Sequence, residues 1–168
     1  MSKARLRQRE QDQQDPAWLA WLAEMDGALE TFFAVDVPGM PTDPFTAAGL
    51  AHAEQALMAM FESADPLLEP ENAAVADRFQ RYVGETFVRS FESRWMNVRI
   101  SENRDTDVFF GRRGFEPVVI RPFQDSFVDV VSMVLTAAHI RTGEEWTWIY
   151  GNSVEDHAEW LSRGRPPL

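Results

Sequence analysis

One stretch constrains the fold more than any other: residues 72–91 carry apolar side chains at the spacing of an amphipathic helix. Burying one large apolar side chain contributes about 1.5–3 kcal/mol. We therefore expect this helix to lie against a sheet or against other helices, with Asn72 as its N-cap and most of its charged residues outside the stripe. The apolar positions are Val75, Phe79, Tyr82, Val83, Phe87, Val88 and Phe91.

Gly84 interrupts the apolar stripe of this helix. In a helix interior, glycine costs about 1 kcal/mol relative to alanine. We interpret it as a point of close backbone packing. A ligand that approaches the backbone at Gly84 is the alternative.

Two further helices are predicted before this stretch. Asp15-Pro16 and Asp43-Pro44 both indicate a helix start, because the acid can cap the first turn and proline fits the first helical position. We predict helices over residues 16–34 and 44–63, which form an N-terminal helical pair. The segments between the helices contain proline or glycine and are predicted loops.

Strand-like patterns follow the central helix. We predict strands over 94–101, 108–110, 115–123 and 145–150, and the sequence Gly111-Arg112-Arg113-Gly114 as the turn of a hairpin. Further helices are predicted from Phe127 to about Arg141, ending before Gly143, and from a capping box at Ser153 to about Arg163. No βαβ alternation runs through the chain, so the predicted fold class is α+β, with an antiparallel sheet of about four strands covered by helices.

A chain of 168 residues is predicted to form one domain, here residues 15–163. Residues 1–14 are predicted to be a basic arm that is disordered or extends a helix, and 164–168 a tail. The chain has no cysteine, no apolar run of membrane-spanning length and a polar first segment. These features predict a cytoplasmic protein without a membrane segment.

Charge is unevenly distributed along the chain, whose net charge is −11. Residues 15–92 hold fourteen acids and three arginines, whereas residues 93–168 hold eleven acids and nine arginines. An acidic region repels phosphate backbones and attracts basic partners. The sequence therefore disfavours nucleic-acid binding. Acidity that only keeps the protein soluble is the simpler interpretation.

The hairpin turn holds the first candidate binding site. Arg112 and Arg113 lie between glycines, and two adjacent arginines can bind a phosphate, a carboxylate or an acidic partner loop. Arg121 on the following strand, with Arg99 or Arg104, would extend the patch. The alternative is a solvated turn that discourages pairing between sheet edges.

The second candidate site is an aromatic row. In the predicted strand 145–150, Trp146, Trp148 and Tyr150 share one face. Such a row can anchor a partner or stack on a ligand. The alternative is that the row faces the core under a helix.

Metal and catalytic sites are not predicted. His52, His139 and His157 sit on three separate predicted helices, without the tight spacing of a zinc site, and His139 fits a core position. The chain also lacks a nucleophile elbow, a Walker-type loop and a dinucleotide-binding glycine motif. We therefore predict no catalytic residues, no metal and no cofactor.

Two segments carry a resemblance to a known group of proteins. Uncharacterised small acidic proteins of actinobacteria, in which a Tyr-x-Gly-Glu helix precedes a Trp-bearing strand, resemble this chain in two segments. These are Arg81-Tyr-Val-Gly-Glu-Thr-Phe-Val-Arg-Ser-Phe-Glu-Ser-Arg-Trp95 and Glu116-Pro-Val-Val-Ile-Arg-Pro-Phe123. The resemblance covers residues 72–150 and implies no catalytic residue. In size, acidity and element order the chain is also similar to bacterial toxin-immunity proteins and to secretion chaperones, an analogy of class only.

These observations favour a non-enzymatic interaction protein of the immunity-protein or secretion-chaperone type. Its acidic half would steer a basic protein partner, and Arg112, Arg113, Arg121, Trp146, Trp148 and Tyr150 would bind it. A small-molecule-binding or enzymatic domain, with a pocket between sheet and helices near Arg112, Arg121 and Trp148, is the alternative. A homodimer that pairs through an edge strand is a third reading.

Overall fold

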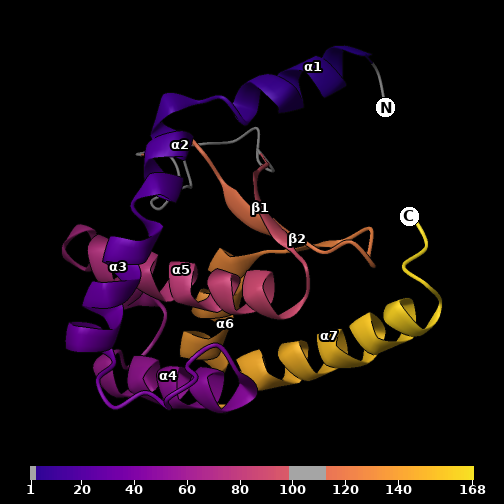
Figure 1. The fold of residues 1–168 in the computed structure, drawn as a ribbon. Helices are drawn as coiled ribbons and strands as arrows, with labels where there is room; N and C mark the ends of the chain where they lie inside the picture. Colours follow the sequence, from indigo (N-terminus) through magenta and orange to yellow (C-terminus); the bar gives the residue numbers. More distant parts are fainter. Residues whose placement is uncertain (1–2, 99–112) are drawn as a thin grey trace.

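The computed structural model describes residues 3–98 and 113–168, and the predicted hairpin tip therefore lies largely outside the described residues. The described chain is mixed helix and strand, with a small antiparallel sheet at one side of a set of helices (Figure 1). The α-helices are α1 (Lys3–Asp12), α2 (Pro16–Ala23), α3 (Met25–Thr31), α4 (Ala47–Met60), α5 (Ala73–Ser90), α6 (Val130–Ile140) and α7 (Glu145–Ser162). The strands are β1 (Arg94–Asn97), β2 (Pro117–Ile120) and β3 (Phe127–Val128), and the short helical turns are η1 (Phe32–Asp36), η2 (Asp65–Leu68) and η3 (Pro70–Asn72).

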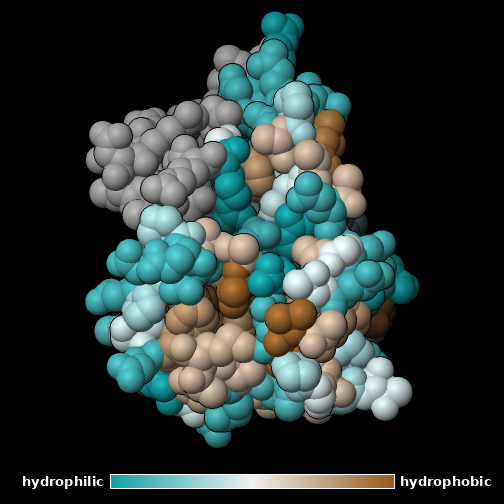
Figure 2. All heavy atoms as spheres, turned by 90° about the vertical axis from the view of Figure 1, so that its left-hand side faces the viewer, coloured by the Kyte–Doolittle hydropathy of each residue, from teal (hydrophilic) through white to brown (hydrophobic). Residues whose placement is uncertain are grey.

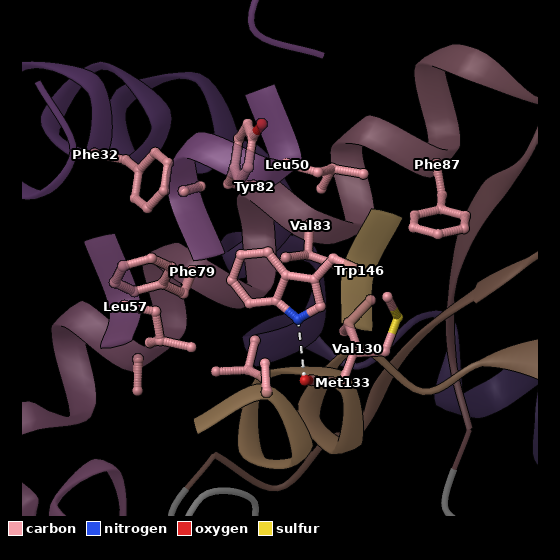
Figure 3. Close-up of a cluster of buried hydrophobic side chains, with 14 of the residues drawn as sticks. Phe32, Leu50, Leu57, Phe79, Tyr82, Val83, Phe87, Val130, Met133 and Trp146 are labelled. Atoms are coloured by element: carbon pink, nitrogen blue, oxygen red, sulfur yellow. Dashed lines mark hydrogen bonds between the residues drawn. The ribbon is translucent and has the colours of Figure 1, made fainter. Parts of the chain in front are cut away.

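Helix α5 forms the centre of the fold, as its apolar stripe predicts. It packs against α3, α6, η1 and both β1 and β2. Phe79, Tyr82, Val83 and Phe87 are fully buried, and Figure 3 shows them among side chains of η1, α4, α6 and α7. The predicted N-cap is wrong, because the Asn72 side chain donates to the carbonyl of Pro66 and makes no capping bond.

Gly84 is a point of close packing, as predicted. A Cβ atom added there would overlap the indole ring of Trp95 on β1. The same indole donates from Nε1 to Glu85 Oε1 at 2.7 Å. The absence of a side chain at Gly84 therefore lets the sheet approach the central helix closely.

The described residues contain one three-stranded antiparallel sheet in the order β1-β2-β3. Trp95 pairs with Val119, and Val119 with Val128. The class α+β is confirmed, but the prediction of about four strands is not. Residues 145–150 are helical, and the predicted strand 108–110 lies outside the described residues.

The free edge of β1 is covered by the segment that follows α1. The Gln13 side chain donates to the Asn97 carbonyl at 2.8 Å and accepts from the Asn97 N–H at 2.9 Å. Asn97 in turn donates from its side chain to the carbonyl of Asp12. A covered edge discourages pairing with another chain, so a dimer through β1 would have to displace Gln13.

The N-terminal helices are more broken than the sequence predicts. Asp15 caps α2 through the N–H groups of Ala17 and Trp18, as predicted. The helix predicted over 16–34 is divided into α2, α3 and the π-helical turn η1. The second helix does not begin at Pro44, because Thr46 provides the cap by accepting from Gly49 N.

Helix α7 corrects the most consequential strand prediction. Residues 145–150 begin an α-helix that runs to Ser162, so the predicted strand and the capping box at Ser153 are both wrong. The cause lies far away in the sequence: the buried carboxylate of Glu54 on α4 accepts from the N–H groups of Glu145 and Trp146, both at 3.0 Å. A carboxylate at these orphan N–H groups stabilises a helix start.

The predicted helix 127–141 is shorter at its start. Phe127 and Val128 form β3, and α6 begins after Asp129, whose carboxylate accepts from Ser132 N. Arg141 takes a left-handed conformation and Gly143 follows with φ +77°, so the helix ends where the sequence predicts. Among the described residues, no helix is long and apolar enough to cross a membrane.

Candidate functional site

The six predicted binding residues do not form one surface site. Arg112 lies outside the described residues. Arg113 and Arg121 engage two different regions of the interior, and Trp146 and Tyr150 contribute to the core. Only Trp148 presents its ring to solvent, at 67% exposure.

Arg113 belongs to a network that we call the Asp77 cluster, formed by Trp21, Asp77, Gln80, Arg81 and Arg113. Asp77 Oδ1 accepts from Trp21 Nε1 at 2.8 Å and from Arg113 Nη1, and Asp77 Oδ2 accepts from Arg81 Nε at 2.6 Å. Arg113 Nη2 donates to Gln80 Oε1 at 3.0 Å. The predicted partner-binding arginine is therefore joined to the central helix.

Arg81 is the deeply buried charge of the Asp77 cluster, with 2% of its surface exposed. Its guanidinium donates to Asp77 and, from Nη1, to the carbonyl of Trp21 at 2.6 Å. It also lies 4.2 Å from the centre of the Trp21 ring and 3.9 Å from a Glu24 carboxylate oxygen. A buried charge is tolerated when it is paired and hydrogen-bonded in this way.

The three aromatic residues of the predicted strand do not share one face, because residues 145–150 belong to α7. Trp146 is fully buried and donates from Nε1 to the carbonyl of Met133 at 3.0 Å (Figure 3). Tyr150, one turn later on the same side of α7, packs on Phe87 and Phe91 and donates to Ser90 Oγ. Trp148 lies between them in the chain and therefore points away from the core.

Arg121 lines a cavity of about 250 Å³, which we call the Arg121 pocket. Arg121 directly follows β2, and the other residues of the pocket lining come from β3, α6, α7 and the residue between β3 and α6. Arg121 is 8% exposed and donates from Nη1 to Ser153 Oγ at 2.8 Å and from Nη2 to Ser126 Oγ at 3.3 Å. The full lining is Arg121, Phe127, Val128, Asp129, Ser132, Met133, Thr136, Glu145 and Ile149.

Within the described chain, Arg121 lacks both a hydrogen-bond partner for Nε and an ion-pair partner. Its Nε is buried and has no hydrogen-bond partner. No carboxylate of the described residues forms an ion pair with it. Burial lowers the pKa of its guanidinium, and the negative charge of Asp156 opposes that shift only in part. Arg121 thus differs from Arg81, which is buried beside its counterion.

The surface of the helical half is acidic because each of its arginines is paired with a carboxylate of the same half. Arg78, Arg81 and Arg89 are the three arginines of residues 15–92, and they pair with Asp36, Asp77 and Glu85 respectively. Within the part of the chain that is described, seven exposed carboxylates of this half make no ion pair. They are Asp26, Glu30, Asp43, Glu62, Asp65, Glu69 and Glu71.

Figure 2 shows the side of the molecule that carries α3, with hydrophilic residues bordering a more apolar patch in its lower half. Asp26 and Glu30 lie on α3, Glu69 directly precedes η3, and Glu71 lies within η3. Both α3 and the η2–η3 segment pack against α5. The acidic residues therefore come from two segments that share one supporting helix.

No metal site emerges from the described residues, where no group of three potential ligands converges. His52 contacts the carbonyl of Pro38 at 3.2 Å. His139 is exposed, so its expected core position is wrong. His157 packs beside Phe91, Phe123 and Trp160 and lies 3.4 Å from Glu92.

Sequence reasoning missed three buried polar residues, Arg81, Glu85 and Glu54. Arg81 and Glu85 belong to the charged residues of the central helix, most of which are expected outside its apolar stripe. Both are nevertheless buried, Arg81 beside Trp21 of α2 and Glu85 beside Trp95. Glu54 lies in an alanine-rich stretch where nothing marks it as a cap for α7. One signal in the sequence could have indicated burial: a charged residue such as Glu54 that is flanked on a helix by small or apolar residues.

Comparison with protein-family models, with curated proteins and with solved structures returned no significant match.

Proposed function

We propose that the protein is a non-enzymatic interaction module that binds a basic protein partner through its acidic helical half. One observation carries this proposal: every arginine of residues 15–92 is paired with a carboxylate of the same half, while seven exposed carboxylates of that half have no ion pair among the described residues. The negative charge of this half is therefore directed outward.

Charge of this kind acts mainly on the rate of encounter and on the choice of partner. Complementary potentials raise association rates, and the effect weakens as salt screens it. A basic partner is the occupant that an uncompensated acidic surface favours. The immunity-protein or secretion-chaperone type remains the class of function that we propose.

The anchors of this interaction differ from those that the sequence suggested. Arg113 and Arg121 donate their hydrogen bonds inside the molecule, and Trp146 is part of the core. Trp148, with two thirds of its surface exposed, is the aromatic residue that is free to contact a partner. The acidic residues, rather than the arginines, carry the proposal.

A pull-down with charge-neutralised variants tests this function. The tagged protein is exposed to lysate of its own cells at low and high salt, beside a variant neutralised on the η2–η3 side and a matched variant neutralised elsewhere. The first variant is Glu62→Gln, Asp65→Asn, Glu69→Gln and Glu71→Gln, and the matched control is Asp125→Asn, Glu144→Gln, Glu155→Gln and Glu159→Gln.

We expect the unmodified protein and the control to capture the same basic protein at low salt. Capture by the η2–η3 variant should fall by about tenfold or more, since steering is lost with the charges. Equal capture by all three proteins, or capture that is insensitive to salt, would contradict the proposal.

A small-molecule-binding domain is the second candidate. It is favoured by the Arg121 pocket, a cavity that lies between the end of the sheet and two helices. The pocket holds a buried arginine that forms no ion pair with any residue of the described chain.

A further inference from the structure

The Arg121 pocket combines one buried positive charge with two carboxylates. Arg121 forms part of its wall, and Asp129 and Glu145 line the same cavity. Phe127, Met133 and Ile149 add apolar surface to the same lining. A cavity with a few polar groups set in apolar walls is the usual form of a small-molecule site.

The buried guanidinium of Arg121 is the group whose charge an anionic ligand would compensate. Among the described residues, this guanidinium donates only to the hydroxyls of Ser153 and Ser126, and Ser153 in turn donates to the carbonyl of Ile149. Neutral hydroxyls stabilise a buried cation less than a carboxylate does. An anionic group placed against Arg121 in the cavity would supply the missing negative charge.

The two carboxylates narrow the class of ligand. Asp129 uses Oδ1 to accept from Ser132 N. Glu145 donates its backbone N–H to Glu54, but no bond of its side chain within the described residues offsets its charge. A simple anion such as inorganic phosphate would be repelled by both acids, whereas a ligand with an additional positive group would be attracted.

We propose that the Arg121 pocket binds a small aminocarboxylate, with its carboxylate at Arg121 and its ammonium at Glu145 and Asp129. The apolar part of the ligand contacts Phe127, Met133 and Ile149. This is a binding site of its own, separate from the acidic surface of the helical half.

The size of the cavity agrees with a ligand of this class. Its volume of about 250 Å³ lies just below the range of roughly 300–1,000 Å³ that is usual for small-molecule sites. A free amino acid or a short amino acid derivative fits such a space.

The first experiment compares matched ligands by titration, followed by calorimetry or by protein NMR. Leucine is compared with isocaproate, which lacks the ammonium group, and with isoamylamine, which lacks the carboxylate. The second set is γ-aminobutyrate, butyrate and butylamine, in which the two charges of the aminocarboxylate are further apart.

At least one aminocarboxylate should bind with a Kd of about 1 mM or below, and about tenfold more tightly than either of its single-charge analogues. No binding by leucine or γ-aminobutyrate at this level would overturn the proposal. A carboxylate that binds as tightly as its aminocarboxylate would overturn it too, because the acids would then contribute nothing.

Variants assign the binding to the pocket. Arg121→Met should weaken aminocarboxylate binding about tenfold or more, and Glu145→Gln should weaken aminocarboxylate binding without weakening that of the carboxylate analogue. Ser132→Trp fills the cavity from an exposed position and keeps the backbone N–H that Asp129 caps. Glu155→Gln, an exposed residue further along α7, is the matched control.

Circular dichroism and thermal melting establish that each variant is folded. If Arg121→Met does not fold, Glu145→Gln and Ser132→Trp still decide the question. Unchanged binding in those two variants would place the ligand elsewhere and contradict the proposal.

Discussion

Two buried arginines in this protein have opposite surroundings. In the Asp77 cluster, Arg81 contacts a carboxylate, a backbone carbonyl and the face of an indole ring. In the Arg121 pocket, Arg121 contacts two hydroxyls and has no ion pair among the described residues, and its Nε is left without a partner. The contacts of Arg81 stabilise the fold, whereas Arg121 can still form an ion pair with an anionic ligand.

The comparison teaches that burial alone does not indicate the role of a charge. Removing one member of a buried ion pair costs about 3–5 kcal/mol, because the other charge is left without compensation. A buried arginine without a carboxylate leaves no such charge behind when it is replaced. The Asp77 cluster should therefore respond to mutation through stability, and the Arg121 pocket through ligand binding.

The largest effect is expected for Asp77→Ala. This change removes the shared acceptor of Trp21, Arg81 and Arg113, so two partly or fully buried guanidinium groups lose the carboxylate that they share. We expect the free energy of unfolding, measured by urea denaturation, to fall by about 3–5 kcal/mol.

Asp77→Asn is the matched control for that change, because its amide oxygen still accepts one hydrogen bond and only the charge is lost. Its effect should be smaller than that of Asp77→Ala. A loss below about 1 kcal/mol in Asp77→Ala would mean that the Asp77 cluster is not a structural ion pair network.

Glu54 provides an intermediate case, a buried carboxylate whose partners are backbone N–H groups. Burial raises the pKa of Glu54 above its ordinary value of 4.5, against the opposing effect of its bonds to Trp146 and Glu145. The native state then binds this proton more tightly than the unfolded chain. The free energy of unfolding should therefore decrease as pH rises from about 4.5 through the raised pKa.

Glu54→Gln tests this prediction, since glutamine keeps an acceptor for the start of α7 but does not titrate. The difference in unfolding free energy between the two proteins should change with pH in that window, with the unmodified protein losing stability relative to Glu54→Gln as pH rises. A difference that is constant from acid to neutral pH would show that the carboxylate of Glu54 has an ordinary pKa in the folded protein.

The smallest effect is expected for Trp148→Ala. The ring is largely exposed on α7, close in sequence to Glu145 and Ile149 but not part of the lining of the Arg121 pocket. We expect a change in unfolding free energy within about 0.5 kcal/mol and unchanged aminocarboxylate binding. A marked loss of that binding would extend the pocket to the surface of α7.

Much of the fold followed from patterns within single segments. The aromatic stripe of α5, the close packing at Gly84, the cap at Asp15 and the end of α6 before Gly143 are all local, and all are confirmed. Each depends on periodicity or on the conformational preference of one residue. Such signals are complete in the sequence.

The start of α7 shows what could not be predicted from the sequence. The sequence Trp146-Thr-Trp-Ile-Tyr150 alternates as a strand does, but the cap that makes it helical comes from Glu54, ninety-one residues before Glu145. The strand reading grouped three aromatic residues on one face, whereas the helix buries Trp146 and exposes Trp148. Contacts between distant segments decide such cases.

The candidate site was predictable only in part. Arg121 was among the predicted binding residues, and it does line a cavity. The sequence does not predict that Arg121 and Arg113 lie in different regions. Their positions differ because Arg113 forms an ion pair with a carboxylate of α5 and Arg121 does not. Neither Asp129 nor Glu145 could be placed in one pocket before β3, α6 and α7 were seen together.

The most direct test of this account is the free energy of unfolding of Arg121→Met beside that of Arg81→Met, both measured by urea denaturation in buffer without ligand. We predict a loss of about 3–5 kcal/mol for Arg81→Met, which leaves part of the Asp77 cluster unpaired, and a change of about 1 kcal/mol or less for Arg121→Met. Equal and large losses in both variants would contradict the account, because Arg121 would then be as structural as Arg81.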